Sequence, residues 1–142
     1  GYVFHFGLLV AIFFFAPHIE FFRSIIGFRW PALPTPLIDA SVVAAMVALV
    51  VELVHRLNNP VKRLLSGTGD YLAWAVTLLP LLTGYLANHH LLFEYTLMLT
   101  LHLFSVELLL VLLPFTKLFH TFSLFISRWY NGDAFARKGV AS

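Results

Sequence analysis

The segment that decides the fold covers residues 97–129 and reads LMLTLHLFSVELLLVLLPFTKLFHTFSLFISRW. It is long and apolar, yet it contains two histidines, His102 and His120, eighteen positions apart. Eighteen residues of α-helix make about five turns and rise about 27 Å, which predicts that both imidazoles leave one face of one helix near opposite membrane surfaces. Ionisable side chains are costly inside a bilayer and usually mark a ligand, a relay or a partner contact. The two histidines are therefore the first candidates for a functional site.

The composition is that of an integral membrane protein. Of the 142 residues, 60% are hydrophobic and 11% are charged, and the mean hydropathy is +0.86. A soluble domain of this size cannot bury so much apolar surface, so we predict one all-α transmembrane domain over residues 1–142 in contact with membrane lipid. The net charge of +2 fits basic loops beside a membrane and gives no support for nucleic-acid binding. With no cysteine, any iron–sulfur cluster must lie in another subunit.

Hydropathy and proline positions predict an antiparallel bundle of four transmembrane helices. We expect spans at residues 1–16, 37–54 and 71–87 and a fourth from about residue 93 past Pro114, whose last turns, 117–128, emerge before a polar tail. Pro31, Pro34 and Pro36 predict an extramembrane connection over residues 19–36. Residues 1–16 lack the basic start and cleavage site of a signal peptide, so we expect a further N-terminal helix ahead of them.

The basic residues predict the orientation. The 55–69 loop and the C-terminal region are both basic and lie two spans apart, which places both in the cytoplasm and makes the chain a multi-pass protein of the inner membrane. Glu20 offsets Arg23 and Arg29 in the first connection. In this topology His5 lies at the depth of His120, and His18 lies at the depth of His102. The basic residues are Arg56, Lys62, Arg63, Lys117, Arg128, Arg137 and Lys138.

Two helices that each offer a histidine at both depths match the needs of bis-imidazole haem b ligation. Neutral imidazoles fill both axial positions of the iron without bringing charge into the bilayer. The predicted pairs are His5 with His120 and His18 with His102. Thirteen residues separate His5 from His18, about 220° of rotation, so the second pair requires a deformed helix, for which Pro17 gives a reason. His89 or His90 could replace His18.

Several of these residues also have plain structural interpretations. A histidine inside a span can serve helix packing alone, and His55 at a span end is typical of a loop residue. Quinol chemistry moves protons, and Glu107 and Glu94 are the candidates for a quinone or proton site. A helix–helix hydrogen bond for Glu107 and a solvated turn for Glu94 are the alternatives.

Three stretches carry a resemblance to a known family: HFGLLVAIFFF from His5, NNPVKRLLSGTGDYLAW from Asn58, and HLFSVELLLVLLPFTKLFH from His102. They resemble the membrane cytochrome b (gamma) subunit of respiratory nitrate reductase and its relatives in heterodisulfide reductase and in sulfite-reduction-linked complexes. The resemblance implies that His5 and His120 ligate a cytoplasm-side haem and that His102 ligates an outer-side haem. It departs from the family at Phe15, where the second histidine of the first ligand helix would stand, and at 34–39, where the quinone-site lysine is missing.

The expected function is that of an electron-transfer subunit and not of a stand-alone enzyme. Two haems b, or one, would pass electrons between a membrane quinone and the iron–sulfur and catalytic subunits of a respiratory oxidoreductase complex. The alternatives are a cofactor-free membrane anchor, a subunit of a proton-coupled transporter, and a haem protein with a structural or sensing role.

Overall fold

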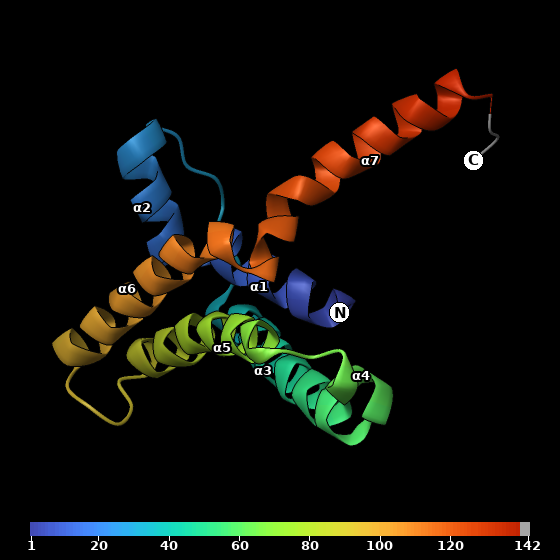
Figure 1. The fold of residues 1–142 in the computed structure, drawn as a ribbon. Coiled ribbons are helices and arrows are strands. Elements are labelled where there is room, and N and C mark those ends of the chain that lie inside the picture. Colours follow the sequence, from blue (N-terminus) through green and yellow to red (C-terminus); the bar gives the residue numbers. More distant parts are fainter. Residues whose placement is uncertain (140–142) are drawn as a thin grey trace.

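The computed structural model describes residues 1–139, and these residues form helices without any strand. Figure 1 shows the order of the elements along the chain. The helices are α1 (Tyr2–Phe14), α2 (Ala16–Ile26), α3 (Thr35–Asn58), α4 (Pro60–Leu64), α5 (Thr68–Asn88), α6 (Tyr95–Leu112), two 3₁₀ turns, η1 (Leu113–Phe115) and η2 (Lys117–Phe119), and α7 (His120–Arg137).

Three helical segments are long and apolar enough to cross a membrane: α3, α5, and α6 extended through η1. A fourth is obtained if α1 and α2 are counted as one span that bends by 60°. The predicted all-helical fold is therefore confirmed, and the length and hydropathy of these helices support the predicted membrane-spanning character.

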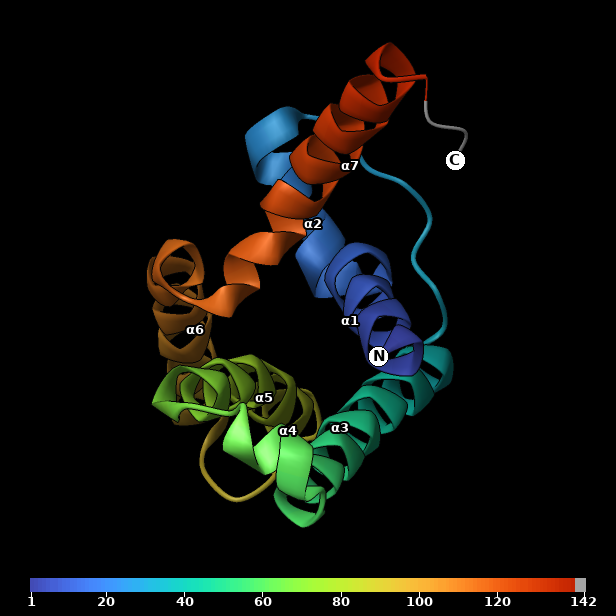
Figure 2. The ribbon, with the colours of Figure 1, turned by 45° about the vertical axis from the view of Figure 1, so that its right-hand side comes forward.

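The helices pack as two pairs joined through α3 and α5. α1 lies against α3, α5 lies against α6, and α3 meets α5. In Figure 2 the two pairs meet at α3 and α5 and stand apart on their other sides, so the arrangement is more open than the predicted four-helix bundle. The buried core lies mainly between α1, α3 and α5 and consists of Val10, Ala11, Ile38, Val42, Ala45, Leu49 and Leu81.

Gly7 explains how α1 comes so close to α3. A Cβ atom at this position would meet the carbonyl oxygen of Ser41 and would lie 2.9 Å from the Cβ of Ala45. Small residues that let helix backbones approach closely are typical of helix pairs in membranes. This contact fixes the side of α1 that faces α3.

The single span predicted to carry both His102 and His120 is wrong. α6 ends at Leu112, two 3₁₀ turns follow, and His120 begins a new helix. Pro114 lacks the N–H that would continue the α-helical hydrogen bonds, and Thr116 adopts an extended conformation with φ −121° and ψ 173°. The five-turn argument for one shared helix face therefore does not apply.

The first predicted span is bent, as the pairing of His18 with His102 requires. Phe15 is extended, with φ −80° and ψ 128°, and α2 restarts with Pro17 in its first turn. The predicted connection over 19–36 is wrong in its first part, because residues 19–26 belong to α2 and Ile19 is buried. Residues 27–34 lead from the end of α2 back to the bend between α1 and α2, where the N–H of Leu33 donates to the carbonyl of Phe14.

α7 extends away from the other helices in Figure 1, and its main packing contact within the described residues is with η2. It continues to Arg137, so the predicted polar tail is helical in its first part. Large apolar side chains of α7 are exposed, among them Phe122, Phe125 and Trp129.

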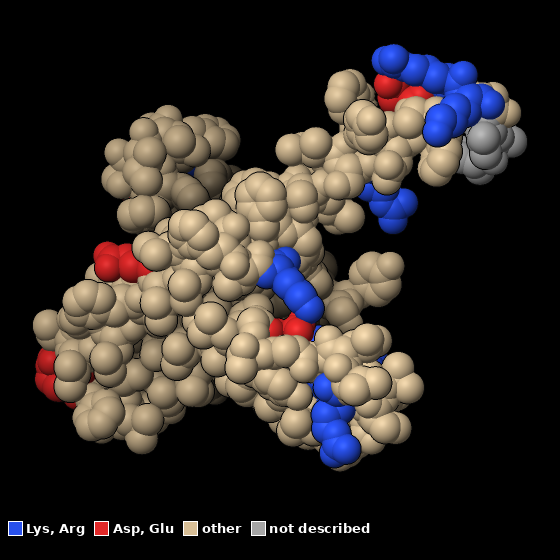
Figure 3. Space-filling model, viewed as in Figure 1, with Lys and Arg blue, Asp and Glu red and all other residues tan. Residues whose placement is uncertain are grey.

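Charged side chains gather at different ends of the fold. In Figure 3, basic groups show beside α4 and, together with acidic groups, at the α6–α7 junction and the far end of α7, and an acidic group shows at the end with the α5–α6 turn. Glu20 contacts both arginines of the first connection, at 3.0 Å from Arg23 and 3.7 Å from Arg29. The prediction that Glu20 offsets the positive charge of these two arginines is thus confirmed.

Candidate functional site

The structure brings the four predicted histidines together in the two predicted pairs. The ring centroids of His5 and His120 lie 6.1 Å apart with an angle of 78° between the ring planes. Those of His18 and His102 lie 6.2 Å apart with an angle of 14°. Each pair joins the N-terminal helices α1 and α2 to the later segment formed by α6 and α7.

Hydrogen bonds determine which ring nitrogen is free. The Nδ1 atoms of His5, His18 and His120 lie 2.9, 2.8 and 2.7 Å from the backbone carbonyl oxygens of Gly1, Ala11 and Lys117. A carbonyl only accepts, so Nδ1 carries the proton and Nε2 keeps its lone pair in each neutral ring. Metal-binding histidines are commonly oriented by this kind of bond from the other ring nitrogen.

His102 has the same pattern with a side-chain acceptor. Its Nδ1 lies 3.3 Å from Oγ1 of Thr83, whose hydroxyl donates to the carbonyl of Leu79 at 2.7 Å. Thr83 therefore accepts from His102, and Nε2 is again the free nitrogen. Ser105 is buried nearby, 3.0 Å from the same Thr83 oxygen, and it donates to the carbonyl of His102.

The separation of the paired rings fits one metal ion between them. Two imidazoles that bind a metal from opposite sides through bonds of about 2 Å have ring centroids about 6 Å apart. Both pairs have this spacing. Within residues 1–139, neither α1 nor α2 packs closely along α6 or α7, so the histidine-bearing backbones are separated as a planar macrocycle between them would require. The residues present therefore fit a haem group.

A search of the described part of the chain finds no group of three or more His, Cys, Asp or Glu side chains arranged to hold a metal ion. A haem iron takes only two ligands from the protein, because the porphyrin supplies the others. Two histidines per site are thus the expected donor set.

Gly84 makes room for the His102 ring on α5. A Cβ at this position would lie 2.9 Å from Cε1 and 3.1 Å from Nδ1 of His102. The glycine therefore serves the histidine and not a helix contact of the kind seen at Gly7. Only a residue without a side chain allows the imidazole to lie against this turn of α5.

We expect Gly84→Ala to lower the haem content of the His18–His102 site several-fold, because the added methyl displaces the His102 ring at a cost of about 1–3 kcal/mol. Gly69→Ala is the matched control in the same helix, since a Cβ there has nothing within 4 Å. Haem per chain and the low-spin electron paramagnetic resonance signals measure the effect. Equal haem content in the two variants would contradict the role of Gly84.

The His5–His120 pair is supported by a charged network that the sequence did not reveal. The Lys117 ammonium lies 2.7 and 2.9 Å from the two carboxylate oxygens of Asp70, and Arg56 lies 3.3 Å from Asp70. Asp70 also accepts from the N–H of Gly67 at the start of α5. Because the Lys117 carbonyl accepts from His120, Asp70 ties the position of His120 to α5 and to the end of α3.

The other predicted candidates lie outside the two pairs. Glu94 caps α6, accepting from the N–H groups of Thr96 and Leu97, so its carboxylate is already engaged. Glu107 is exposed on α6. Five residues from His102 correspond to about 140° around the helix, so it leaves another face than His102. His90 stacks on Tyr95 at 4.9 Å, and His55 is exposed at the end of α3.

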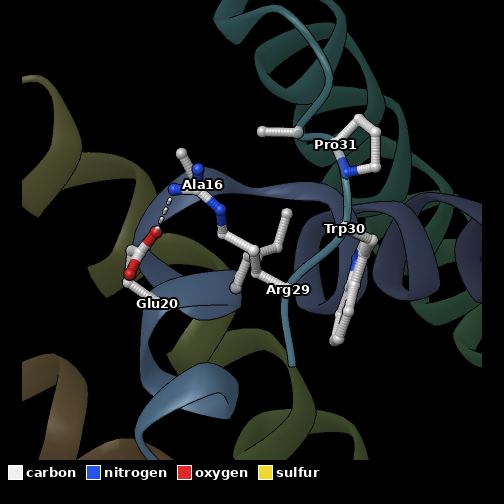
Figure 4. Close-up of a pocket in the computed structure, with 7 residues that line it drawn as sticks. Ala16, Glu20, Arg29, Trp30 and Pro31 are labelled. Atoms are coloured by element: carbon white, nitrogen blue, oxygen red, sulfur yellow. Dashed lines mark ion pairs between the residues drawn. The ribbon is translucent and has the colours of Figure 1, made fainter. Parts of the chain in front are cut away.

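Figure 4 shows an opening lined by residues of α2 and of the connection that follows. Glu20 and Arg29 form an ion pair across it, and Trp30 and Pro31 form part of its wall. Trp30 also donates to the carbonyl of Phe13. The charged groups that line the opening, Glu20 and Arg29, thus neutralise each other.

Comparison with known proteins finds a sequence similarity that extends over almost the whole chain. A protein of Nitratidesulfovibrio vulgaris (strain Hildenborough), described only as a protein, is 34% identical over 137 residues, which are 96% of this chain and 60% of the relative. The chain thus spans 60% of the length of this relative. No protein-family model matches the chain, and no solved structure matches it.

Proposed function

We propose that this chain is a cytochrome b subunit that carries electrons between a membrane quinone and an iron–sulfur partner subunit of a respiratory redox complex. The observation that carries the proposal is the pairing of four histidines, at 6.1 and 6.2 Å between ring centroids, with Nδ1 of every ring engaged. A histidine that serves packing alone has no need for a partner histidine at this spacing.

The topology of the proposal follows from the helices and charges. Four spans, the first of them bent, would cross the inner membrane, with the basic α4 region and the C-terminal region in the cytoplasm. The His5–His120 pair then lies toward the cytoplasm, beside the network of Asp70, Lys117 and Arg56. The His18–His102 pair lies toward the outer surface.

The chain's own residues would hold and orient the cofactors. His5 and His120 would bind one haem b and His18 and His102 the other, through Nε2 in each case. Bound haem b supplies a one-electron carrier at each site. Thr83 and the backbone carbonyls would keep the four Nδ1 protons in place. Lys117 and Arg56 offer positive charge near the cytoplasmic site, where an acidic iron–sulfur partner could approach.

The test uses the complex purified from membranes with this chain in it. The dithionite-reduced minus oxidised spectrum should show b-type bands, and addition of duroquinol or menadiol should reduce a large share of the same haem. Absence of b-type bands would contradict the proposal and favour a cofactor-free anchor. Haem that dithionite reduces but both quinols leave oxidised would contradict the quinone-linked role.

A further inference from the structure

The end of the fold with the α5–α6 turn holds a polar pair that the two histidine sites do not use. His89, the residue that ends α5, places its Nε2 3.1 Å from Oδ1 of Asp39 in α3. The side chains of His89 and Asp39 are 33% and 25% exposed. Tyr85, one turn earlier in α5, lies against the His89 ring at 4.5 Å between centroids.

This contact defines the chemistry of His89. Nε2 is the ring nitrogen beside the carboxylate, which leaves Nδ1 as the ring nitrogen that can take up a further proton. A carboxylate beside one ring nitrogen favours the tautomer that carries its proton there, so that the other nitrogen is the acceptor of the further proton. The partly exposed ring can then release that proton to water. The pair therefore has the parts of a proton acceptor.

The pair also lies close to one of the histidine sites. Tyr85, which stacks on His89, directly follows Gly84, which lies against the His102 ring. The rise along α5 from Gly84 to His89 is about 7 Å. Glu94, the acidic residue of the same turn, is engaged in capping α6, and Asp39 is the carboxylate that pairs with His89 at this end of α5.

We infer that Asp39 and His89 form the proton-accepting dyad for quinol oxidation at the outer end of the chain, an inference that rests on the proposed function. A quinol gives up two electrons to the haem b centres and two protons. Each O–H bond breaks with its proton passing to Nδ1 of His89 while Nε2–H stays beside Asp39. The imidazolium releases the proton to water at its exposed edge before the second transfer.

His89→Gln tests the dyad in the membrane complex, with His90→Gln as the matched control in the same turn. We expect His89→Gln to slow haem reduction by duroquinol on the order of 100-fold, the usual effect of losing a general base. Haem content and reduction by dithionite should be unchanged, and Asp39→Asn should slow the reaction less. His90→Gln should react like the unaltered protein.

A second readout needs no turnover. Equilibrium binding of a fluorescent hydroxyquinoline N-oxide to the oxidised complex should weaken about tenfold in His89→Gln, as expected for one lost hydrogen bond, and stay unchanged in His90→Gln. Unaltered binding and quinol reduction in His89→Gln would overturn the dyad and leave the proposed function standing. Failure of the unaltered complex to react with quinol would instead overturn both.

Discussion

Replacement of His120 by alanine should remove one of two low-spin b signals and leave the other. His120 begins α7, its Nδ1 is bound by the Lys117 carbonyl, and its ring lies 6.1 Å from that of His5. Without the imidazole, one axial position of that iron has no protein ligand. Electron paramagnetic resonance of the oxidised complex, together with haem per chain, measures the loss.

His55→Ala is the control for this experiment, because His55 is an exposed histidine in the last turn of α3 that belongs to neither pair. It should keep both signals. A full spectrum in His120→Ala would show that the His5–His120 pair holds no haem. His5→Ala should give the same spectrum as His120→Ala, since the two rings would serve one iron.

Replacement of His18 by alanine should remove the other low-spin signal. This prediction separates His18 from Phe15, which stands where the resembled family has its histidine and whose ring here packs on the edge of His18 at 5.3 Å. The 60° bend between α1 and α2 brings His18 to within 6.2 Å of His102. The expected result is one haem per chain instead of two.

His90→Ala provides the comparison at the same end of the molecule, and it should retain both haems. Unchanged haem content in His18→Ala would identify His18 as a packing residue and leave His102 without its partner. A double variant, His18→Ala with Phe15→His, tests whether the missing family position can restore the site. Restored haem would show that a histidine at either position 15 or position 18 of the bent segment can serve as the ligand.

The sequence predicted which histidines meet, although part of the reasoning was wrong. Depth in the membrane paired His5 with His120 and His18 with His102, and the structure places these rings together. The helix between His102 and His120 was predicted to be continuous, but Pro114 and Thr116 interrupt it. Pro114 was the available signal, and the apolar residues around it concealed the break.

Other features depend on contacts between residues far apart in the chain. The ion pairs of Asp70 with Lys117 and of Asp39 with His89 join different helices, and no local pattern in the sequence indicates them. The role of Gly84 likewise appears only once α5 and α6 are packed, because a helical glycine can as well serve backbone contact. The membrane helices were predictable because hydropathy is a local property of the sequence. The packing of one helix against another depends on residues far apart in the chain and was therefore not predictable in the same way.

The central claim is that the two histidine pairs hold haem, and a pyridine haemochrome assay on the purified complex tests it most directly. With the amount of this chain measured in parallel, we predict two haems b per chain. A value of one would mean that only one pair binds haem and would contradict the account for the other. A value of zero would contradict the account as a whole.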